Sequence, residues 1–153
     1  MKKGKKMIKT LTSVKYLVVH CSASPPSVDA DATMIDRWHR ERGFLKIGYH
    51  YVIKRDGTVE PGRDETHVGA HEPRVNQVSV AICMVGGVNA QGKAEANFTD
   101  AQFVSLERLL TELRGRYPGA EILGHRDIPG VRKDCPSFNV QQWWAGRQRG
   151  ADV

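Results

Sequence analysis

Three side chains capable of chemistry lie in one short segment, residues 124–138, which prolines and glycines break up. The segment reads GHRDIPGVRKDCPSF and contains His125, Lys133 and Cys135. Three interpretations fit these residue types: a surface loop with scattered polar side chains, a thiol nucleophile with His125 as its base, or part of a metal site. The rest of the sequence has to decide among them.

Two histidines follow short apolar runs that predict buried strands. The run KYLVV precedes His20, and the run AEILG precedes His125. Ligands of open α/β sheets gather in the crevice at the strand ends, so these two side chains are candidates for one site. With Cys135 they would offer two nitrogens and one sulfur, a set that suits zinc and leaves one coordination position open.

Spacing alone does not decide between a metal site and a cysteine nucleophile. The wide separation of His20 from His125 and Cys135 matches no compact zinc-finger pattern. A nucleophile at Cys135 would use His125 as its base, but it leaves His20 and Lys133 without a role. Cys21 directly follows His20 and points to the opposite face of a strand, so we do not expect both to bind one ion.

The remaining histidines and one further cysteine are assigned surface or structural positions. His39 lies among charged residues of a predicted helix and is expected on its solvated face. His50 and His67 accompany predicted hairpin strands and are interpreted as ordinary polar positions. His71, in HVGAH, could line a groove, and Cys83 lies in an apolar run that places it in the core.

The predicted elements alternate between strands and helices. Capping boxes are predicted at Thr33 with Asp36 and at Thr99 with Gln102. Strands are expected at residues 16–19, in a hairpin over 48–63, in a central strand at 78–87 and at 120–124, and helices over 33–43, 97–119 and 140–148. This order indicates a single α/β domain with a central mixed β-sheet flanked by helices.

Length and composition fit one compact domain in a reducing compartment. The 153 residues are 40% apolar and 26% charged, which is ordinary for a soluble globular protein. Three widely spaced cysteines do not form a disulfide framework. No run approaches the roughly 20 apolar residues that cross a bilayer. Lys9 and Lys15 interrupt the apolar region that a signal peptide needs, so the chain is expected to stay in the cytoplasm where it is made.

The N-terminus is strongly basic. Over the whole chain, lysine and arginine outnumber acidic residues by 23 to 17. Four of the lysines fall within residues 2–6. Such a surplus favours a polyanionic partner, namely nucleic acid, anionic lipid or an acidic wall polymer, or else it keeps the terminus soluble. We therefore expect a flexible extension over residues 1–12 and a folded domain over residues 13–150.

Six segments, in order, cover most of the chain from Val18 to Trp144. They read VVHCSA, GYHYVIKRDGTVEPGRDE, VGAH, SVAICMVGG, NFTDAQFVSLERLL and GHRDIPGVRKDCPSF. Each is weak alone, but together the chain resembles the zinc-dependent N-acetylmuramoyl-L-alanine amidases of the amidase type 2 family, especially the short bacteriophage lysozymes of the T7 kind. The resemblance implies the α/β fold that these enzymes share with peptidoglycan recognition proteins.

The resemblance also implies a ligand set. His20, His125 and Cys135 would bind Zn²⁺, with the cysteine at a position where many family members carry aspartate. The neighbouring Asp134 would then not be a ligand. Noncatalytic relatives typically lose the cysteine, so its presence here argues for an active enzyme.

Further roles follow for four residues. Tyr49, in GYH, and Lys133 match the catalytic tyrosine and lysine of the phage enzymes, while His71 and Asn76 are candidates for the substrate groove. Zinc lowers the pKa of a bound water from about 15.7 towards ~7. Lys133 could stabilise the oxyanion of the tetrahedral intermediate, and Tyr49 could orient water or donate a hydrogen bond. The sequence does not divide these tasks between the two.

The implied activity is hydrolysis of the amide bond between N-acetylmuramic acid and L-alanine in peptidoglycan. The chain would be a phage or prophage endolysin, a monomer that reaches the cell wall after the membrane is permeabilised. Two alternatives stay open: a noncatalytic module that binds muropeptides, and a regulator of phage RNA polymerase. The polymerase contact rests on the resemblance alone, with the basic N-terminus as its candidate surface.

Overall fold

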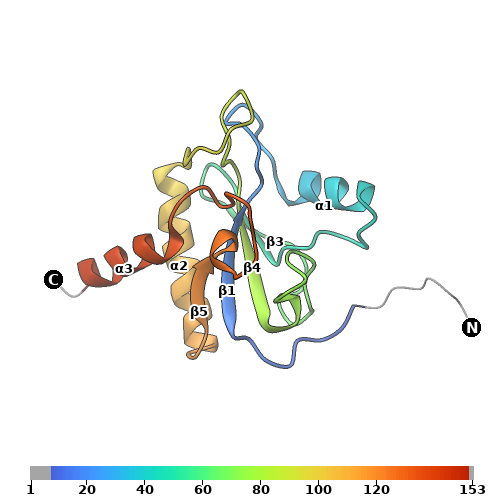
Figure 1. Cartoon of the computed structure of the whole chain (residues 1–153), viewed down its shortest axis with the longest axis vertical. Helices are drawn as coiled ribbons and strands as arrows, with labels where there is room; N and C mark the ends of the chain where they lie inside the picture. The colour runs from blue at the N-terminus through green and yellow to red at the C-terminus, as the bar shows by residue number, and fades with distance from the viewer. Residues whose placement is uncertain (1–7, 152–153) are drawn as a thin grey trace, which may run out of the picture.

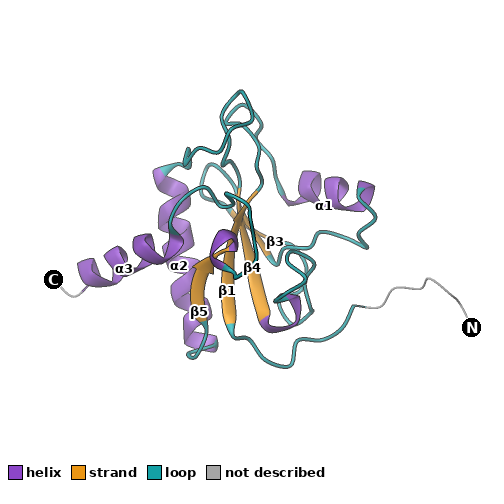
Figure 2. Ribbon diagram, viewed as in Figure 1, coloured by secondary structure: helices purple, strands orange, loops and turns teal. Residues whose placement is uncertain are grey.

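A five-stranded mixed β-sheet with helices on both sides forms the protein (Figures 1 and 2). The computed structural model describes residues 8–151, with side chains described over residues 8–148. The strands, in the sheet order β3-β2-β4-β1-β5, are β3 (Val59–Pro61), β2 (Tyr51–Ile53), β4 (Ser79–Met84), β1 (Tyr16–Cys21) and β5 (Glu121–Gly124). The helices are α1 (Ala32–Glu41), α2 (Asp100–Arg116) and α3 (Val140–Ala151), with short 3₁₀ turns at Asn76–Val78 and His125–Asp127.

The sheet is mixed because of one strand. β1 pairs in parallel with β4 and β5, β2 pairs in parallel with β4, and only β3 runs antiparallel, to β2. β4 lies in the middle and is buried along its whole length, as the apolar run at 78–87 predicted. The single α/β domain with a central mixed sheet is therefore confirmed.

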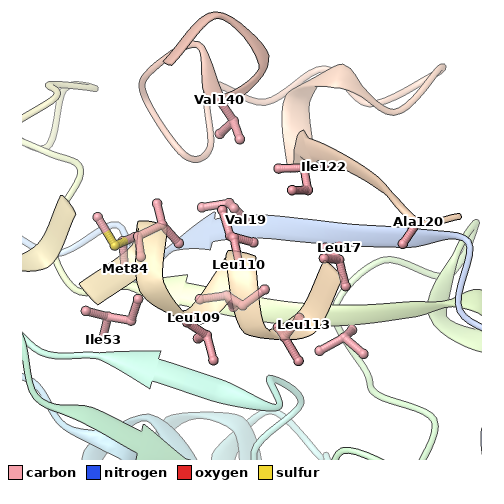
Figure 3. Close-up of a cluster of buried hydrophobic side chains, with 13 residues drawn as sticks. Leu17, Val19, Ile53, Met84, Leu109, Leu110, Leu113, Ala120, Ile122 and Val140 are labelled. Carbon is pink, nitrogen blue, oxygen red and sulfur yellow. The ribbon is translucent and has the colours of Figure 1, made fainter. Parts of the chain in front are cut away.

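Alternation along β1 and β4 sends buried side chains to both faces of the sheet. Leu17 and Val19 of β1 pack with Leu110 and Leu113 of α2, and the same cluster includes Val140 of α3 (Figure 3). The residues between them face the other way, because successive strand side chains point to opposite sides. On that second face Cys83 packs with residues of and around α1, so its predicted core position is confirmed.

The long helix begins as the sequence predicted. Thr99 Oγ1 accepts a hydrogen bond from the Gln102 backbone N–H at 3.1 Å, and Gln102 Oε1 accepts one from the Thr99 N–H at 2.9 Å. The fully buried Gln102 also donates its amide to the carbonyls of Ile53 and Val85, at 3.1 and 2.9 Å. The cap thus anchors α2 to the ends of β2 and β4.

The predicted capping box of the first helix is wrong. α1 begins at Ala32, and Asp31 is its N-cap, with Oδ1 accepting from the Met34 N–H at 2.8 Å. Thr33 lies inside the first turn and cannot cap it. Aspartate caps as well as threonine does, so two candidate residues stood side by side in the sequence and local pattern could not choose between them.

Part of the predicted basic extension pairs with the domain. The Leu11 N–H donates to the Thr66 carbonyl and the Val68 N–H to the Lys9 carbonyl, both at 2.7 Å. The chain from Lys9 to Leu11 therefore lies along residues 66–68. The lysine cluster at 2–6, and with it the candidate polymerase contact, lies outside the described residues. None of the helices described over 8–151 is long and apolar enough to cross a membrane.

A shielded carboxylate joins the hairpin region to the end of α2. Glu65 accepts hydrogen bonds from the hydroxyls of Tyr51 and Tyr117, the latter at 2.6 Å, and from the Arg116 guanidinium. Burial opposes ionisation, but these three donors outweigh it and hold the pKa of Glu65 below its ordinary value. The ionised form therefore stabilises the fold.

We predict that Glu65→Gln lowers the free energy of unfolding by about 1–3 kcal/mol at pH 7, because hydrogen bonds to a charged acceptor are weakened. A carboxyl with a lowered folded-state pKa stabilises the protein above its unfolded pKa, about 4.3, and loses that contribution as the pH falls through the folded pKa. The gap between wild type and variant should therefore shrink below about pH 4 in urea titrations. Glu41→Gln, at an exposed position, is the matched control; an equal loss there would contradict the assignment.

Candidate active site

Strand pairing brings two distant histidines together. β1 and β5 are parallel neighbours in which Val19 lies opposite Gly124, so the next residues, His20 near the end of β1 and His125 directly after β5, lie side by side. Their ring centroids are 4.4 Å apart, and both side chains are buried. They lie on the face opposite α2, because His20 follows the alternation of β1.

The loop after β5 returns the cysteine to the same place. The Arg126 N–H donates to the Cys135 carbonyl at 2.9 Å, which closes the loop, and the Cys21 N–H donates to Cys135 Sγ at 3.2 Å. Cys135 Sγ lies 3.9 Å from His20 Nδ1. One potential ligand atom from each of His20, His125 and Cys135 lies within 4.8 Å of the others.

The donor set fits zinc. Tetrahedral bonds of about 2.0–2.1 Å to nitrogen and 2.3 Å to sulfur place ligand atoms roughly 3.3–3.6 Å apart. The 3.9 Å between His20 Nδ1 and Cys135 Sγ is close to that spacing, and the three potential ligand atoms all lie within 4.8 Å of one another. Cys21 contacts Cys135 through its backbone N–H and its thiol, but it is not part of the group of three potential ligands.

Both imidazoles are held from behind by buried polar groups. His125 Nε2 lies 3.0 Å from Glu72 Oε1, and His20 Nε2 lies 2.8 Å from His71 Nδ1. Burial and the neighbouring histidines keep the pKa of His20 well below its ordinary value, and burial above all lowers the pKa of His71 to about 3. His20 and His71 are thus both neutral near pH 7. Neutral imidazole is the form that binds metals, so His20 is ready to do so.

Glu72 is a buried carboxylate in the cavity wall, beside His125, that the sequence did not indicate. Although burial opposes ionisation, hydrogen bonds from His125 and Arg74 hold the pKa of Glu72 at about 2. Arg74 contacts Glu72 Oε2 at 2.9 Å and reaches the Gly130 carbonyl at 3.3 Å. The carboxylate is thereby connected to the loop that carries Cys135. The adjacent letters HE at 71–72 were the only sequence signal.

All the predicted site residues line one cavity of about 520 Å³. They are His20, His125, Cys135, Tyr49, Lys133, His71 and Asn76. A volume of this size suits a small ligand or one segment of a polymer. An adjoining hollow of about 440 Å³ shares Phe44, Ala70, Pro73 and Asn76 with it, which lengthens the groove towards Lys9.

Tyr49 and Lys133 bring different groups to this cavity. The Tyr49 ring lies 5.0 Å from the His20 ring, and burial raises the pKa of Tyr49 well above its ordinary value, so the phenol keeps its proton and can donate it in a hydrogen bond. Lys133 is exposed, and its charge contributes to the low pKa of His20. The cavity therefore contains a neutral O–H donor and a cation beside the histidine cluster.

The match to known proteins covers most of the chain. The family model for N-acetylmuramoyl-L-alanine amidase matches residues 10–138. The endolysin of Escherichia phage T7 is 47% identical over 132 residues, which are 86% of each chain, and that of Enterobacteria phage T3 is 45% identical over 141 residues, 92% of each. Among solved structures, the endolysin amidase LysCS of Clostridium intestinale superposes with a TM-score of 0.80 at 28% identity, covering 94% of this chain and 89% of its own.

This chain belongs to the N-acetylmuramoyl-L-alanine amidase family. The family assignment confirms the enzyme class and the resemblance to phage endolysins that the six sequence segments predicted.

His71 and Asn76, both expected in the substrate groove of the amidase, also form hydrogen bonds within the protein. His71 uses both ring nitrogens, with His20 on one side and Ser79 Oγ at 2.9 Å on the other. Asn76 Oδ1 accepts from the backbone N–H groups of His71 and Glu72, at 2.9 and 2.8 Å. Asn76 therefore shapes the loop on which both histidine supports lie.

The expected solvated position of His39 is wrong. His39 is buried, its Nδ1 accepts from the Gly48 N–H at 2.9 Å, and its ring lies 5.1 Å from that of Tyr49 in the cavity wall. Burial lowers the pKa of His39 to about 4. The sequence interpretation weighed the charged neighbours, whereas the spacing from buried Ile35, four residues earlier on α1, was the informative signal.

His50 acts as a structural residue. It is buried, its Nδ1 accepts from the Ala81 N–H at 3.0 Å, and its Nε2 lies 2.7 Å from the His67 carbonyl. The ring thus joins the entry of β2 to β4 and to the following loop, and it does not line the cavity that contains His20.

Close backbone packing positions Tyr49. The Ala70 N–H donates to the Gly48 carbonyl at 3.1 Å, and a Cβ added at Gly48 would lie 1.9 Å from the Ala70 carbonyl oxygen. Only glycine permits this approach. It sets the tyrosine directly beside the loop that carries His71.

We predict that Gly48→Ala destabilises the amidase by more than about 3 kcal/mol, because backbone atoms on both sides would have to separate. Gly115→Ala is the control: it lies in α2 with nothing within 4 Å of the added carbon and should raise stability by about 0.5–1 kcal/mol. Chemical denaturation measures both. A Gly48→Ala protein as stable as wild type would show that this packing is not required.

Proposed function

We propose that this amidase is an endolysin that uses Zn²⁺, held by His20, His125 and Cys135, to hydrolyse the bond between N-acetylmuramic acid and L-alanine in peptidoglycan. The observation that supports the metal most strongly is the convergence of these three side chains, distant in sequence, at the end of β1 and β5. When bound, zinc lowers the pKa of a water molecule and polarises a carbonyl as a Lewis acid.

The three proposed ligands would differ in charge. The lowered pKa of His20 keeps its imidazole neutral, so it can offer a nitrogen lone pair without a proton having to leave first, and His125 would supply the second nitrogen. The adjacent Cys21 thiol and burial raise the pKa of Cys135, and a bound cation would favour its thiolate. One anionic ligand leaves the site with a net positive charge, which favours the developing negative charge of the reaction.

Lys133 and Tyr49 would act on the substrate carbonyl. Attack on an amide produces an oxyanion, and preorganised donors that face it provide a large part of the rate enhancement. Lys133 offers a charge at the cavity rim, and Tyr49 offers a phenolic hydrogen from within it. We propose that both stabilise this oxyanion. The neighbouring hollow next to Asn76 would accommodate more of the polymer.

The domain of residues 13–150 would act as a monomer, because a single chain supplies every residue of the proposed site. A noncatalytic muropeptide-binding protein would not require the sulfur ligand, which this chain retains beside His20.

Digestion of purified sacculi tests the bond that is cleaved. Mass spectrometry should find new L-alanine amino termini together with intact glycan strands. New reducing sugar ends would instead identify a glycosidase and exclude the amidase assignment.

Cys135→Ser tests the proposed ligand set. We expect both zinc content and cleavage to fall, because a serine hydroxyl is a poor replacement for a thiolate. Asp134→Asn, an exposed neighbour, is the matched control and should retain both. Unaltered zinc content and cleavage in Cys135→Ser would remove the sulfur from the mechanism.

Lys133→Ala and Tyr49→Phe test the two donors. Each should lower kcat by roughly 10²–10³, the usual effect of losing one oxyanion donor, while zinc content stays at the wild-type level. Arg132→Ala, which removes an exposed charge one residue away, should have little effect on kcat. Full activity in either variant would assign that side chain a structural role only.

A further inference from the structure

A chain of hydrogen bonds behind His20 begins at a group that can only accept. The Val75 carbonyl accepts the hydroxyl hydrogen of Ser79 at 2.7 Å. A serine hydroxyl has one hydrogen, so Ser79 Oγ can only accept from its next neighbour. That neighbour is His71 Nε2, at 2.9 Å, which must therefore be protonated.

The hydrogen bond from His71 to Ser79 also fixes which atom donates between His71 and His20. A neutral imidazole has one N–H, so His71 Nδ1 is an acceptor once Nε2 carries the hydrogen. His71 Nδ1 lies 2.8 Å from His20 Nε2, which must then be the donor. His20 is left with its lone pair on Nδ1, the nitrogen that lies 3.9 Å from Cys135 Sγ.

A second, independent support fixes His125. The Glu72 carboxylate only accepts hydrogen bonds, and its Oε1 lies 3.0 Å from His125 Nε2. That nitrogen is therefore protonated, and Nδ1 of His125 is left free for a metal. Glu72 is 4% exposed and is held by the Arg74 backbone N–H and guanidinium, at 3.0 and 2.9 Å.

We propose that Ser79, His71 and Glu72 are positioning residues that fix both ligand imidazoles with the hydrogen on Nε2 and so present both Nδ1 atoms to the metal. This inference rests on the proposed zinc site. It gives His71 a role beyond the substrate groove: without the Ser79–His71 chain, His20 is free to place its hydrogen on the nitrogen that faces the ion. The partners behind a metal-bound histidine generally contribute 10–100-fold to metal affinity.

The imidazole hydrogens are read directly by ¹⁵N NMR of histidine-labelled, zinc-free wild-type protein. We expect His20, His71 and His125 each to carry the hydrogen on Nε2, and zinc to shift the Nδ1 resonances of His20 and His125. A hydrogen on Nδ1 of His20 or His125, or zinc shifts at Nε2, would overturn the inference even if every variant failed to fold.

Zinc affinity, measured by competition with a chelator, tests the same residues by substitution. His71→Leu and Glu72→Ala should each weaken binding about 10–100-fold. His71→Gln should largely restore affinity, because its amide can accept from His20 and donate to Ser79. His67→Gln, outside the cavity lining, is the control and should bind zinc as wild type does.

The double variant of Ser79→Ala and His71→Leu tests whether Ser79 affects zinc binding through His71 or separately from it. Ser79→Ala weakens binding through His71, so adding it to His71→Leu should cause no further loss. Wild-type affinity in His71→Leu or in Glu72→Ala would refute the role of that residue while leaving the zinc site intact. Failure of wild-type protein itself to bind zinc would refute the proposed function instead.

Discussion

The parallel pairing of β1 with β5 is the constraint on which the site depends. The register that sets Val19 opposite Gly124 brings His20 and His125 to the same sheet edge, and the loop from His125 then needs only to fold back to deliver Cys135. A slip of one residue would turn His20 into the apolar core under α2 and a core side chain into the cavity. The same hydrophobic alternation that stabilises the sheet therefore also orients the histidine.

The two faces of the sheet have different tasks. The face under α2 is an apolar cluster, to which Leu17, Val19 and the leucines of α2 contribute. The opposite face buries several imidazoles and a carboxylate, which would be costly if they lacked partners. Each is paired instead: His20 with His71, His125 with Glu72, and His39 with the Gly48 backbone. Because these partners have fixed donor and acceptor roles, the network that makes burial tolerable also defines where hydrogens lie.

Local signals in the sequence predicted the elements that have strong periodicity or caps. The capping box of α2, the hairpin over 48–63 and the buried run of β4 were all predicted from neighbouring residues. The start of α1 was misplaced because Asp31 and Thr33 are both good caps. Residues at strand ends indicated His20 and His125, and the segment 124–138 offered Cys135 and Lys133 as candidates. The family resemblance then implied their roles and added Tyr49.

The supports of the site were beyond sequence reasoning for a physical reason. Glu72 reaches His125, 53 positions away, only because the loop before β4 lies against the end of β5. Ser79 acts through His71, and its hydroxyl resembles that of any strand residue until its partners are known. The burial of His39 was not predicted, because its charged sequence neighbours are typical of a solvated helix face. Side chains that act through another side chain have no motif of their own, since their spacing depends on tertiary packing.

The central claim is that two imidazole nitrogens and one thiolate sulfur converge on one ion. X-ray absorption at the zinc edge, measured on fully active protein, tests it most directly. The account predicts stoichiometric zinc with one sulfur at about 2.3 Å and two imidazole nitrogens at about 2.0–2.1 Å. Active protein without stoichiometric metal, or a zinc shell that lacks sulfur, would contradict it.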